Sequence, residues 1–540
     1  MKLPNRITWE KRSYFERRLL KQILAHHVGQ IWYLEILIPE VRASDFIGRK
    51  FVTKNQYIEY LQELGIEFFQ SDQGLCYAKI SKGDATYALS LDSGDFKQFV
   101  MLRIYEKFGK AMDDRQLKTI AVACRAKALF GEDKRNVYIR TAPIDPTNPF
   151  EGIEIDLGND QGECVRITKN SIEVDQPSVL FLRPQNLLPL PKPADSGDIL
   201  KLFDYINVDG NEQRLTLLSF VINALLPEGP YPLLILTGQE GSGKTSATEF
   251  LSSVIDPRTG VNRAMNQNER ELAISASRSH LMTFDNLSGI RFNISDFLCR
   301  LSTGGTFEIR RLYTDTDVLE INFSKPVIMN SIVDLVSKPD LAQRTYILEL
   351  TSLSEKNRKT KSELKKSFVE DQPVIFRGIC EAIQMGLQMR KVTKLLKPPR
   401  MADCAKFAAS ASPAFGSTPD AVVKAMEKVQ DNQRLYIASV DPVFQAVQSL
   451  MEKVTEWDGT ATELYNLLGE TFSADGIPRP SNWPKTVENF SKDLNRLQGN
   501  LLGMGIKYEK ERTAKSRTIR LSRASSITKL VEEYARVSIA

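Results

Sequence analysis

The segment that most constrains the fold is a glycine-rich loop between an apolar run and a helix-forming stretch. Residues 238–245 read Gly-Gln-Glu-Gly-Ser-Gly-Lys-Thr and match the pattern GxxxxGK[ST]. The apolar run Leu233 to Leu236 precedes the loop, and a helix predicted from Lys244 to Val254 follows it. Glycines let the backbone N–H groups of such a loop point at phosphate oxygens, and the helix N-terminus adds positive potential. The sequence therefore predicts a nucleotide-binding α/β fold.

We expect this loop to bind ATP together with Mg²⁺. Lys244 would reach the β- and γ-phosphates, and the hydroxyl of Thr245 would bind the metal. The residues expected to contact the nucleotide are Gly238, Gln239, Glu240, Gly241, Ser242, Gly243, Lys244, Thr245 and Ser246.

Two further apolar runs end in polar residues. Asp285 follows the run 281–284, and Asn330 follows the run 326–329. In an open α/β sheet the carboxyl ends of the strands are where a ligand binds. Asp285 is therefore expected to be the second magnesium ligand, and Asn330 to hold the attacking water or the γ-phosphate. An amide that satisfies strand-end carbonyls is the alternative for Asn330.

Asn286 raises a question about the chemistry, because a carboxylate that activates water is expected beside the magnesium ligand. An amide cannot accept a proton. Asn286 would then only orient the water, or another carboxylate would act as the base. Glu240 and Glu308 are weak candidates.

Two arginines are candidates for contacts with the γ-phosphate. Arg344 is expected to reach the nucleotide of a neighbouring subunit, where it would stabilise charge in the transition state. Arg400 is expected to be a lid arginine on the same nucleotide. A plain surface role is the alternative for Arg344.

A β-hairpin is predicted between Asp285 and Asn330. Two alternating runs, Phe307 to Tyr313 and Val318 to Phe323, flank the polar residues 314–317. Arg310 and Arg311 on this hairpin could face DNA phosphates. A hairpin that only packs between subunits is the alternative.

The carboxyl-terminal part predicts a winged helix. Helices are expected at Ala461 to Leu468 and at Thr486 to Leu502, followed by strands at 506–512 and 517–521. Local basic surplus favours binding to phosphates. The alternatives are a solvated basic face or a protein-docking module. The expected DNA contacts are Lys492 and Arg496 on the second helix and Lys515 and Arg517 on the wing.

The domain order follows from these motifs and from a cluster of prolines. We expect an N-terminal α+β domain, a proline-rich linker, an ATPase core, a helical lid, a winged helix and a last helix. The N-terminal domain is expected at 1–183 and the linker at 184–195. The ATPase core is expected at 196–350 and the lid at 351–435, followed by the winged helix at 436–523 and the last helix at 524–540. The first domain begins with a basic amphipathic helix at Trp9 to His27, and its further role is open.

Bulk composition excludes several classes of protein. The net charge of +5 over 540 residues is small, so any DNA-binding surface must be local. No apolar run is long enough to cross a bilayer, so no membrane association is expected. The six cysteines are widely spaced and form no CxxC pair, which is typical of reduced cysteines in a cytoplasmic protein.

Taken together, the ordered motifs resemble a known family. The segments GQEGSGKT, TFDNLSGI, LSTGGTFEIRRLYTDTD, KPVIMN, PDLAQR and PPRMADCAKFAA are similar to AAA+ ATPases of bacterial mobile elements and phages. These ATPases are related to superfamily 3 and MCM-like helicases, including the replicative helicases of staphylococcal cassette and pathogenicity-island elements. The resemblance is good over about 196–420 and near 455–522, and weaker over the first 130 residues.

The resemblance implies an AAA+ core with a helical lid, a homo-oligomer that is a hexameric ring when active, and ATP-driven unwinding of DNA during replication of a mobile element. Two other functions remain open. One is an ATP-switched initiator that binds an origin without unwinding it. The other is an ATPase that remodels a protein complex, for example in phage defence.

Overall fold

The computed structural model describes residues 54–310, 318–331, 339–351, 360–395, 398–439, 441–474, 479–480, 483–512 and 517–523. The predicted helices at 9–27 and 524–540 lie outside these residues, as do Arg311 and Lys515. For Arg310 and Arg517, the structure describes the backbone but not the side chain.

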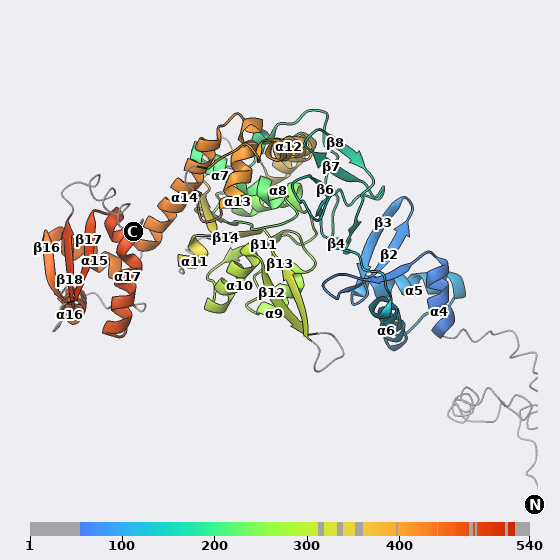
Figure 1. Cartoon of the computed structure of the whole chain (residues 1–540), viewed down its shortest axis with the longest axis horizontal. Coiled ribbons are helices and arrows are strands. Elements are labelled where there is room, and N and C mark those ends of the chain that lie inside the picture. Colours follow the sequence, from blue (N-terminus) through green and yellow to red (C-terminus); the bar gives the residue numbers. More distant parts are fainter. Residues whose placement is uncertain are drawn as a thin grey trace, which may run out of the picture.

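A parallel four-stranded sheet forms the centre of the molecule (Figure 1). Its strands lie side by side in the order β11 (Met282–Leu287), β14 (Val327–Ser331), β10 (Leu233–Thr237) and β15 (Thr345–Glu349). The first three are the strands that the sequence predicts, and β15 is an additional edge strand. Because all four run in one direction, the loop after β10 and the polar ends of β11 and β14 meet at the carboxyl edge of the sheet.

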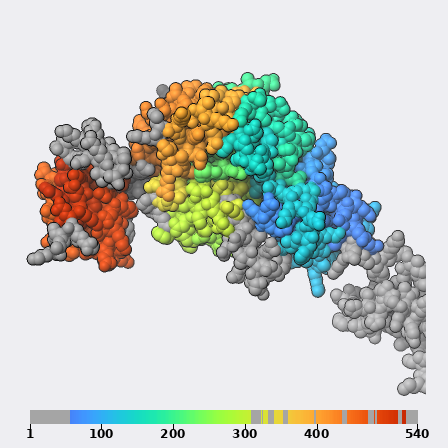
Figure 2. Space-filling view, in the orientation of Figure 1, coloured from blue at the N-terminus to red at the C-terminus, as the bar shows by residue number. Residues whose placement is uncertain are grey.

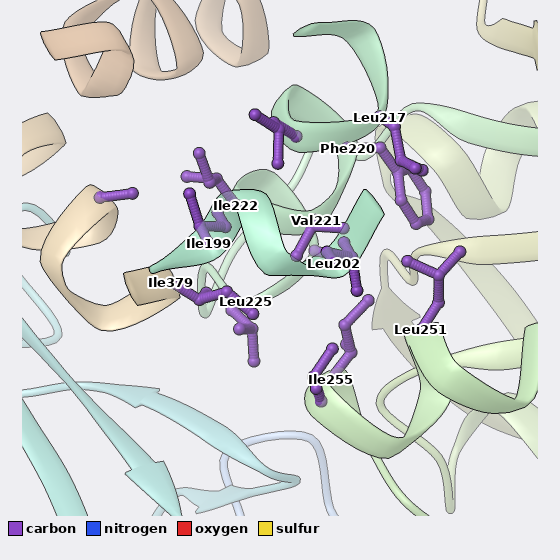
Figure 3. Close-up of a cluster of buried hydrophobic side chains, with 14 of the residues drawn as sticks. Ile199, Leu202, Leu217, Phe220, Val221, Ile222, Leu225, Leu251, Ile255 and Ile379 are labelled. Atoms are coloured by element: carbon purple, nitrogen blue, oxygen red, sulfur yellow. The ribbon is translucent and has the colours of Figure 1, made fainter. Parts of the chain in front are cut away.

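Both faces of this sheet are covered, which explains why its strands are apolar without alternation. Leu234 and Leu236 point into a core with the helices α7 (Asn211–Ala224), α8 (Lys244–Ile255) and α12 (Lys361–Met389). Leu233 and Ile235 point to the other face, toward α9 (Glu269–Ala276) and α10 (Phe292–Thr303). Figure 3 shows the first core, in which side chains of α7 meet those of α8 and of the 3₁₀ helix η3 (Ile199–Asp204).

Helices follow the sheet, as the sequence predicts for the lid. They are α12, α13 (Ala402–Ala411), the 3₁₀ helix η5 (Ser412–Phe415) and α14 (Pro419–Ser439). The short helix α11 (Pro339–Ala342) lies earlier, just before β15. Thr360 and Glu363 begin α12 with a reciprocal capping box. Pro373 lies inside α12, and its own carbonyl accepts a hydrogen bond from Ala194 N at 3.1 Å.

The N-terminal unit has a hydrophobic core of its own, formed between residues 57 and 128. Its elements are α4 (Lys54–Glu63), β1 (Glu67–Gln70), β2 (Cys76–Lys82), β3 (Ala85–Ser90), α5 (Gly94–Phe108) and α6 (Asp114–Phe130). The strands form an antiparallel sheet in sequence order.

The predicted boundary at residue 183 does not coincide with a break between cores. A second antiparallel sheet contains β5 (Thr141–Pro143), β6 (Gly152–Asp156), β7 (Cys164–Thr168) and β8 (Ile172–Asp175). Apolar residues of β6 and β7, such as Ile153 and Ile167, belong to the same core as α7 and α8. Beside this sheet, β4 (Val137–Tyr138) pairs with β9 (Leu180–Phe181). In terms of packing, the second sheet is therefore part of the central body, whereas β4 and β9 pack against the N-terminal unit at Phe69, Tyr77 and Ala88.

The proline-rich segment predicted to be a linker is packed against the central body. Leu190 is buried, and its backbone N–H donates to Leu157 O at 2.8 Å. Asp198 N donates to Val374 O at 3.1 Å. A Cβ atom on Gly197 would lie 2.2 Å from the backbone nitrogen of Gly378, so only glycine permits this approach to α12.

A buried carboxylate ties the second sheet to the central sheet. Asp256, at the end of α8, accepts hydrogen bonds from Arg140 Nε at 3.0 Å and from Arg258 Nε at 2.7 Å. It also accepts the backbone N–H groups of His280 at 3.0 Å and Leu281 at 3.2 Å, just before β11. Burial alone would raise the pKa of Asp256, but the two arginines outweigh that effect and hold the pKa well below its usual range.

The predicted hairpin is present. β12 (Gly305–Arg310) pairs with β13 (Val318–Phe323) in antiparallel register. Phe307 anchors it on α10, with its ring centroid 5.0 Å from that of Phe297. Gln73 of the N-terminal unit donates to Asn322 O at 3.0 Å, so the hairpin also contacts that unit.

The C-terminal unit has a separate core and lies beyond α14, at the left of Figures 1 and 2. Its helices are α15 (Pro442–Lys453), α16 (Ala461–Ala474) and α17 (Val487–Gly503). Its strands β16 (Glu456–Thr460), β18 (Arg517–Arg523) and β17 (Ile506–Arg512) form one antiparallel sheet in that order. The predicted helices and both predicted strands are present, α16 runs further than predicted, and β16 was not predicted. Within the described parts of the chain, no helix is both long and apolar enough to cross a membrane.

His280 makes the stability of the central body depend on pH. Burial lowers its pKa to about 4, with a further contribution from Lys325, whereas the unfolded value is near 6.5. A group whose pKa is lowered by folding binds protons more readily when unfolded, so stability is full above pH 6.5 and falls between pH 6.5 and 4. The loss is on the order of 3 kcal/mol, at about 1.4 kcal/mol for each pH unit. Urea unfolding across this range should show it.

His280→Gln is the matched variant, because its amide can still donate to Ala224 O, which the imidazole Nε2 contacts at 2.5 Å. This variant should lose most of the slope between pH 6.5 and 4. An unchanged slope would contradict the assignment to His280.

Candidate functional site

The loop between β10 and α8 approaches the backbone of β15 closely. Gly238 has a φ of 139°, and a Cβ on it would lie 2.6 Å from Leu350 O and 2.8 Å from Ser242 Oγ. Gly243 has a φ of 87°, in the left-handed region, where it begins α8. Both positions therefore require glycine, which leaves the loop backbone open toward a ligand.

Lys244 lies across the loop that it follows. Its ammonium donates to Gly238 O at 2.7 Å and to Gln239 O at 2.9 Å. Desolvation lowers the pKa of Lys244, while the nearby carboxylates of Glu240 and Asp285 favour the charged form. The ammonium is thus held where an incoming phosphate group could take over its hydrogen bonds.

Thr245, Asp285 and Asn330 meet in one hydrogen-bonded group. The hydroxyl of Thr245 lies 3.3 Å from both carboxylate oxygens of Asp285. The amide of Asn330 donates to Asp285 Oδ1 at 2.8 Å. These residues come from α8, β11 and β14, and the parallel order of the strands brings them to the carboxyl edge of the sheet.

The donor set of this group suits Mg²⁺. A hydroxyl and a single carboxylate are hard oxygen ligands, and Mg²⁺ in nucleotide sites keeps several waters and phosphate oxygens besides such ligands. Thr245 and Asp285 would therefore hold the metal.

Asn286 adopts an unusual backbone conformation next to Asp285. Its φ is 53°, in the left-handed region that asparagine tolerates, and the residue is exposed. Its N–H donates to Asp285 Oδ1 at 3.1 Å. Of the two alternative bases, Glu240 is exposed in the loop, and Glu308 lies on β12 opposite Glu320, with a side chain outside the description.

The remaining loop residues occupy different environments. Ser242 is buried, and its backbone N–H donates to Gln239 O at 3.2 Å. Gly241 is exposed and has a φ of 80°, and Ser246 is half-buried in the first turn of α8.

Arg344 and Arg400 lie together, away from Lys244. Both pair with Asp340, Arg344 directly through Nη1 and Arg400 through Nη2 at 2.6 Å. Arg400 also donates to the side chain of Gln343. The hydrogen bond from Arg344 lowers the pKa of Asp340. The two arginines are therefore held by one carboxylate.

This arginine cluster lies at the amino edge of the sheet. Arg344 precedes β15, and its carbonyl accepts the N–H of Leu233 at the start of β10. Lys244 follows the other end of β10. Five residues of strand span roughly 16 Å, so the cluster and the loop are at opposite edges. Arg400 lies beside Arg344 at this edge, and the expectation that both contact the same nucleotide stays a prediction.

The C-terminal unit changes the expectation for one predicted DNA contact. Arg496 pairs with Asp441 at 2.5 Å and with Asp493 at 3.3 Å, and Asp441 in turn caps the N-terminus of α15. Lys492, one turn earlier on α17, is exposed. Arg496 therefore joins two helices of the unit, and Lys492 remains available to a phosphate.

Three residues of these sites were not identified from the sequence. Thr248 is buried and donates to Asn330 Oδ1 at 2.8 Å, Asp340 binds both arginines, and Asp256 fixes the far end of α8. Helical spacing in the sequence could have indicated the first two. Thr248 is three residues after Thr245 on α8, and Asp340 is four residues before Arg344.

Comparison with known proteins gives two matches to family models and some distant structural likenesses. Residues 199–432 match the model of an actinomycete integrative conjugative element replication protein, and residues 443–533 match the C-terminal domain model of this RepA protein. No curated protein sequence matches the chain.

Among solved structures, "The A form apo structure of NrS-1 C terminal region-CTR" is 14% identical and covers 87% of this chain and 98% of its own, with a TM-score of 0.37. "The apo structure of NrS-1 C terminal region (305-718)" is 13% identical, covers 88% and 100%, and has the same TM-score of 0.37.

The matched boundaries agree with the packing, because the first match begins at η3 and the second at α15. The two matches together span more than half of the chain, which belongs to the replication-protein family of actinomycete integrative conjugative elements.

Proposed function

We propose that the chain is a Mg²⁺-dependent ATPase of the AAA+ type that unwinds DNA when the element replicates. The observation that carries the proposal is the convergence of Lys244, Thr245, Asp285 and Asn330 at one edge of a parallel sheet. Membership in a family of replication proteins supports the biological role. The more specific resemblance of the motifs to the replicative helicases of staphylococcal elements stays a prediction.

The protein groups of the site would act mainly by charge and orientation. The ammonium of Lys244 would leave the loop carbonyls and bind the β- and γ-phosphates. Bound Mg²⁺ would neutralise phosphate charge beside Thr245 and Asp285. Asn330 gives one amide hydrogen to Asp285 and keeps a second that can orient the attacking water.

The arginine cluster supports an assembly of several subunits. Because Arg344 and Arg400 lie at the opposite sheet edge from the loop, they could meet a γ-phosphate only across a subunit interface. A homo-oligomer, such as a hexameric ring, would bring the arginine edge of one subunit to the loop edge of the next. Asp340 would release the arginines to the phosphate in that interface.

DNA would be engaged by two parts of the chain. The hairpin β12–β13 carries Arg310 and Arg311, and the C-terminal unit, which we propose to be a winged helix, carries Lys492, Lys515 and Arg517. The hairpin is inserted between α10 and the start of β14, so its base lies at the amino edge of the sheet, opposite the loop. Movement at the base of the hairpin could then be transmitted through the hairpin to bound DNA.

An origin-binding initiator without unwinding is the second candidate, because the matching family is described as a replication protein. Strand displacement on a forked duplex with ATP separates the two. Displacement that depends on hydrolysis supports the helicase. ATP-dependent duplex binding without displacement supports the initiator, and ATPase activity that ignores DNA but responds to a protein partner would favour a remodelling ATPase.

Lys244→Ala should abolish ATP hydrolysis while leaving the fold intact. The lost ammonium removes charge stabilisation at the transferred phosphate, which is typically worth orders of magnitude in rate. Phosphate release by the purified variant is the measurement. Lys428→Ala is the control, since Lys428 pairs with Glu212 at the surface. Near-normal turnover in Lys244→Ala would refute the site.

Arg344→Ala and Arg400→Ala should each retain nucleotide binding and lose most hydrolysis. Mixing either variant with Lys244→Ala should restore part of the activity, because some mixed interfaces then pair an intact loop with intact arginines. Arg377→Ala, which breaks only a pair within α12, should hydrolyse ATP normally. If mixing restores nothing, the arginines do not act between subunits.

Lys492→Ala and Arg496→Ala should have different effects on DNA binding. Loss of a phosphate contact at Lys492 should weaken duplex binding and reduce the salt slope by about 1. Arg496→Ala should change the slope little and instead lower the melting temperature of the C-terminal unit, because its charge is already matched by Asp441 and Asp493. Fluorescence anisotropy across a salt series measures the salt slopes, and thermal unfolding measures the melting temperature.

A chain that ends after Ser439 keeps the whole of α14 and should retain the ATPase core but lose at least tenfold in duplex affinity, about 1.4 kcal/mol. Equal binding by this shortened chain would show that the C-terminal unit is not the DNA anchor.

A further inference from the structure

We infer that Thr248 is a positioning residue for ATP hydrolysis, which acts by fixing the orientation of the Asn330 amide. This inference rests on the proposed function and adds a residue to its site. Thr248 lies on α8, three residues after Thr245, so both hydroxyls are on one face of the helix. Thr248 is fully buried, and its hydroxyl donates to Asn330 Oδ1 at 2.8 Å.

The chemistry of the neighbours allows the Asn330 amide only one orientation. Asp285 is acceptor-only when ionised, so the group that faces its Oδ1 at 2.8 Å must be the NH₂ of Asn330. The carbonyl oxygen of Asn330 then faces Thr248, which must supply a hydrogen. A hydroxyl can supply one and a methyl group cannot.

The result is a chain of three contacts from Thr248 through Asn330 to Asp285 and on to Thr245. Asn330 itself is almost completely buried, with 1% of its surface exposed. Without the donor, its carbonyl oxygen would be buried without a partner, which is unfavourable. The amide would then turn, and a turned amide would present its oxygen to the Asp285 carboxylate and lose the hydrogen that orients water.

Thr248 itself contacts neither phosphate nor metal in this arrangement. Its removal should therefore alter the rate of hydrolysis and spare the affinity for ATP, which depends on the loop and on Lys244. The magnesium concentration needed for half-maximal rate should rise, because Asp285 loses the donor that holds its carboxylate in place.

The test compares two substitutions at Thr248 in the full-length protein. Thr248→Val removes the hydroxyl at nearly constant volume, and kcat should fall at least tenfold with KM for ATP within about twofold. Thr248→Ser keeps the hydroxyl and should stay within about threefold of the unmodified rate. Ser252→Ala is the matched control, since Ser252 is a buried serine one turn further along α8 that lies outside the site.

A double-variant cycle decides whether Thr248 acts through Asn330. Single-turnover hydrolysis with excess protein is measured for Asn330→Ala with and without Thr248→Val. If the inference holds, Thr248→Val has no further effect once the Asn330 amide is gone. An equal loss in both backgrounds would overturn the inference, as would a normal rate for Thr248→Val or a loss that appears only in ATP affinity.

Failure of the proposed function would look different. If the unmodified, assembled protein does not hydrolyse ATP, the proposed ATPase itself is wrong. If it does and Thr248→Val matches it, only the role of Thr248 is wrong.

Discussion

The buried carboxylate of Asp256 is the constraint on which the rest of the structure depends. It gathers Arg140 from the loop before the second sheet, Arg258 from the segment after α8, and the backbone N–H groups that lead into β11. Removal of one partner from such a buried ion pair typically costs about 3–5 kcal/mol, because the remaining charge has no compensation. Since α8 begins at the glycine-rich loop and β11 leads to Asp285, this one carboxylate fixes the far ends of both elements that form the proposed magnesium site.

The parallel sheet divides the functional residues between two edges. Its carboxyl edge holds the loop, Asp285 and Asn330, while its amino edge holds Arg344 and Arg400 on Asp340. Arg344 and Arg400 therefore lie away from the loop of their own subunit, which gives the proposed assembly a chemical reason. Within one chain, the carboxylate of Asp340 compensates their charge.

Much of the candidate site could be predicted because its signals are local. The glycines, Lys244 and Thr245 are contiguous, and Asp285 and Asn330 each end an apolar run, so their strands and their common edge followed from the sequence. The replication of a mobile element, expected from the motifs, is confirmed by the family match. Unwinding, the bound nucleotide and the ring remain predictions. The boundary at 183 was wrong in terms of packing, because composition does not reveal that Ile153 and Ile167 share a core with α7.

The sequence by itself determined the loop, the strands that flank it, the hairpin and the C-terminal helices, because each depends on residues close together in the chain. Only the tertiary structure decided which charges are matched and which edge each residue occupies. Arg400 and Asp340 are 60 residues apart, Arg496 and Asp441 are 55 apart, and Thr248 and Asn330 are 82 apart. Side-chain hydrogen bonds of this kind leave no periodic pattern in a sequence, since each partner is chosen by how distant helices and strands pack together.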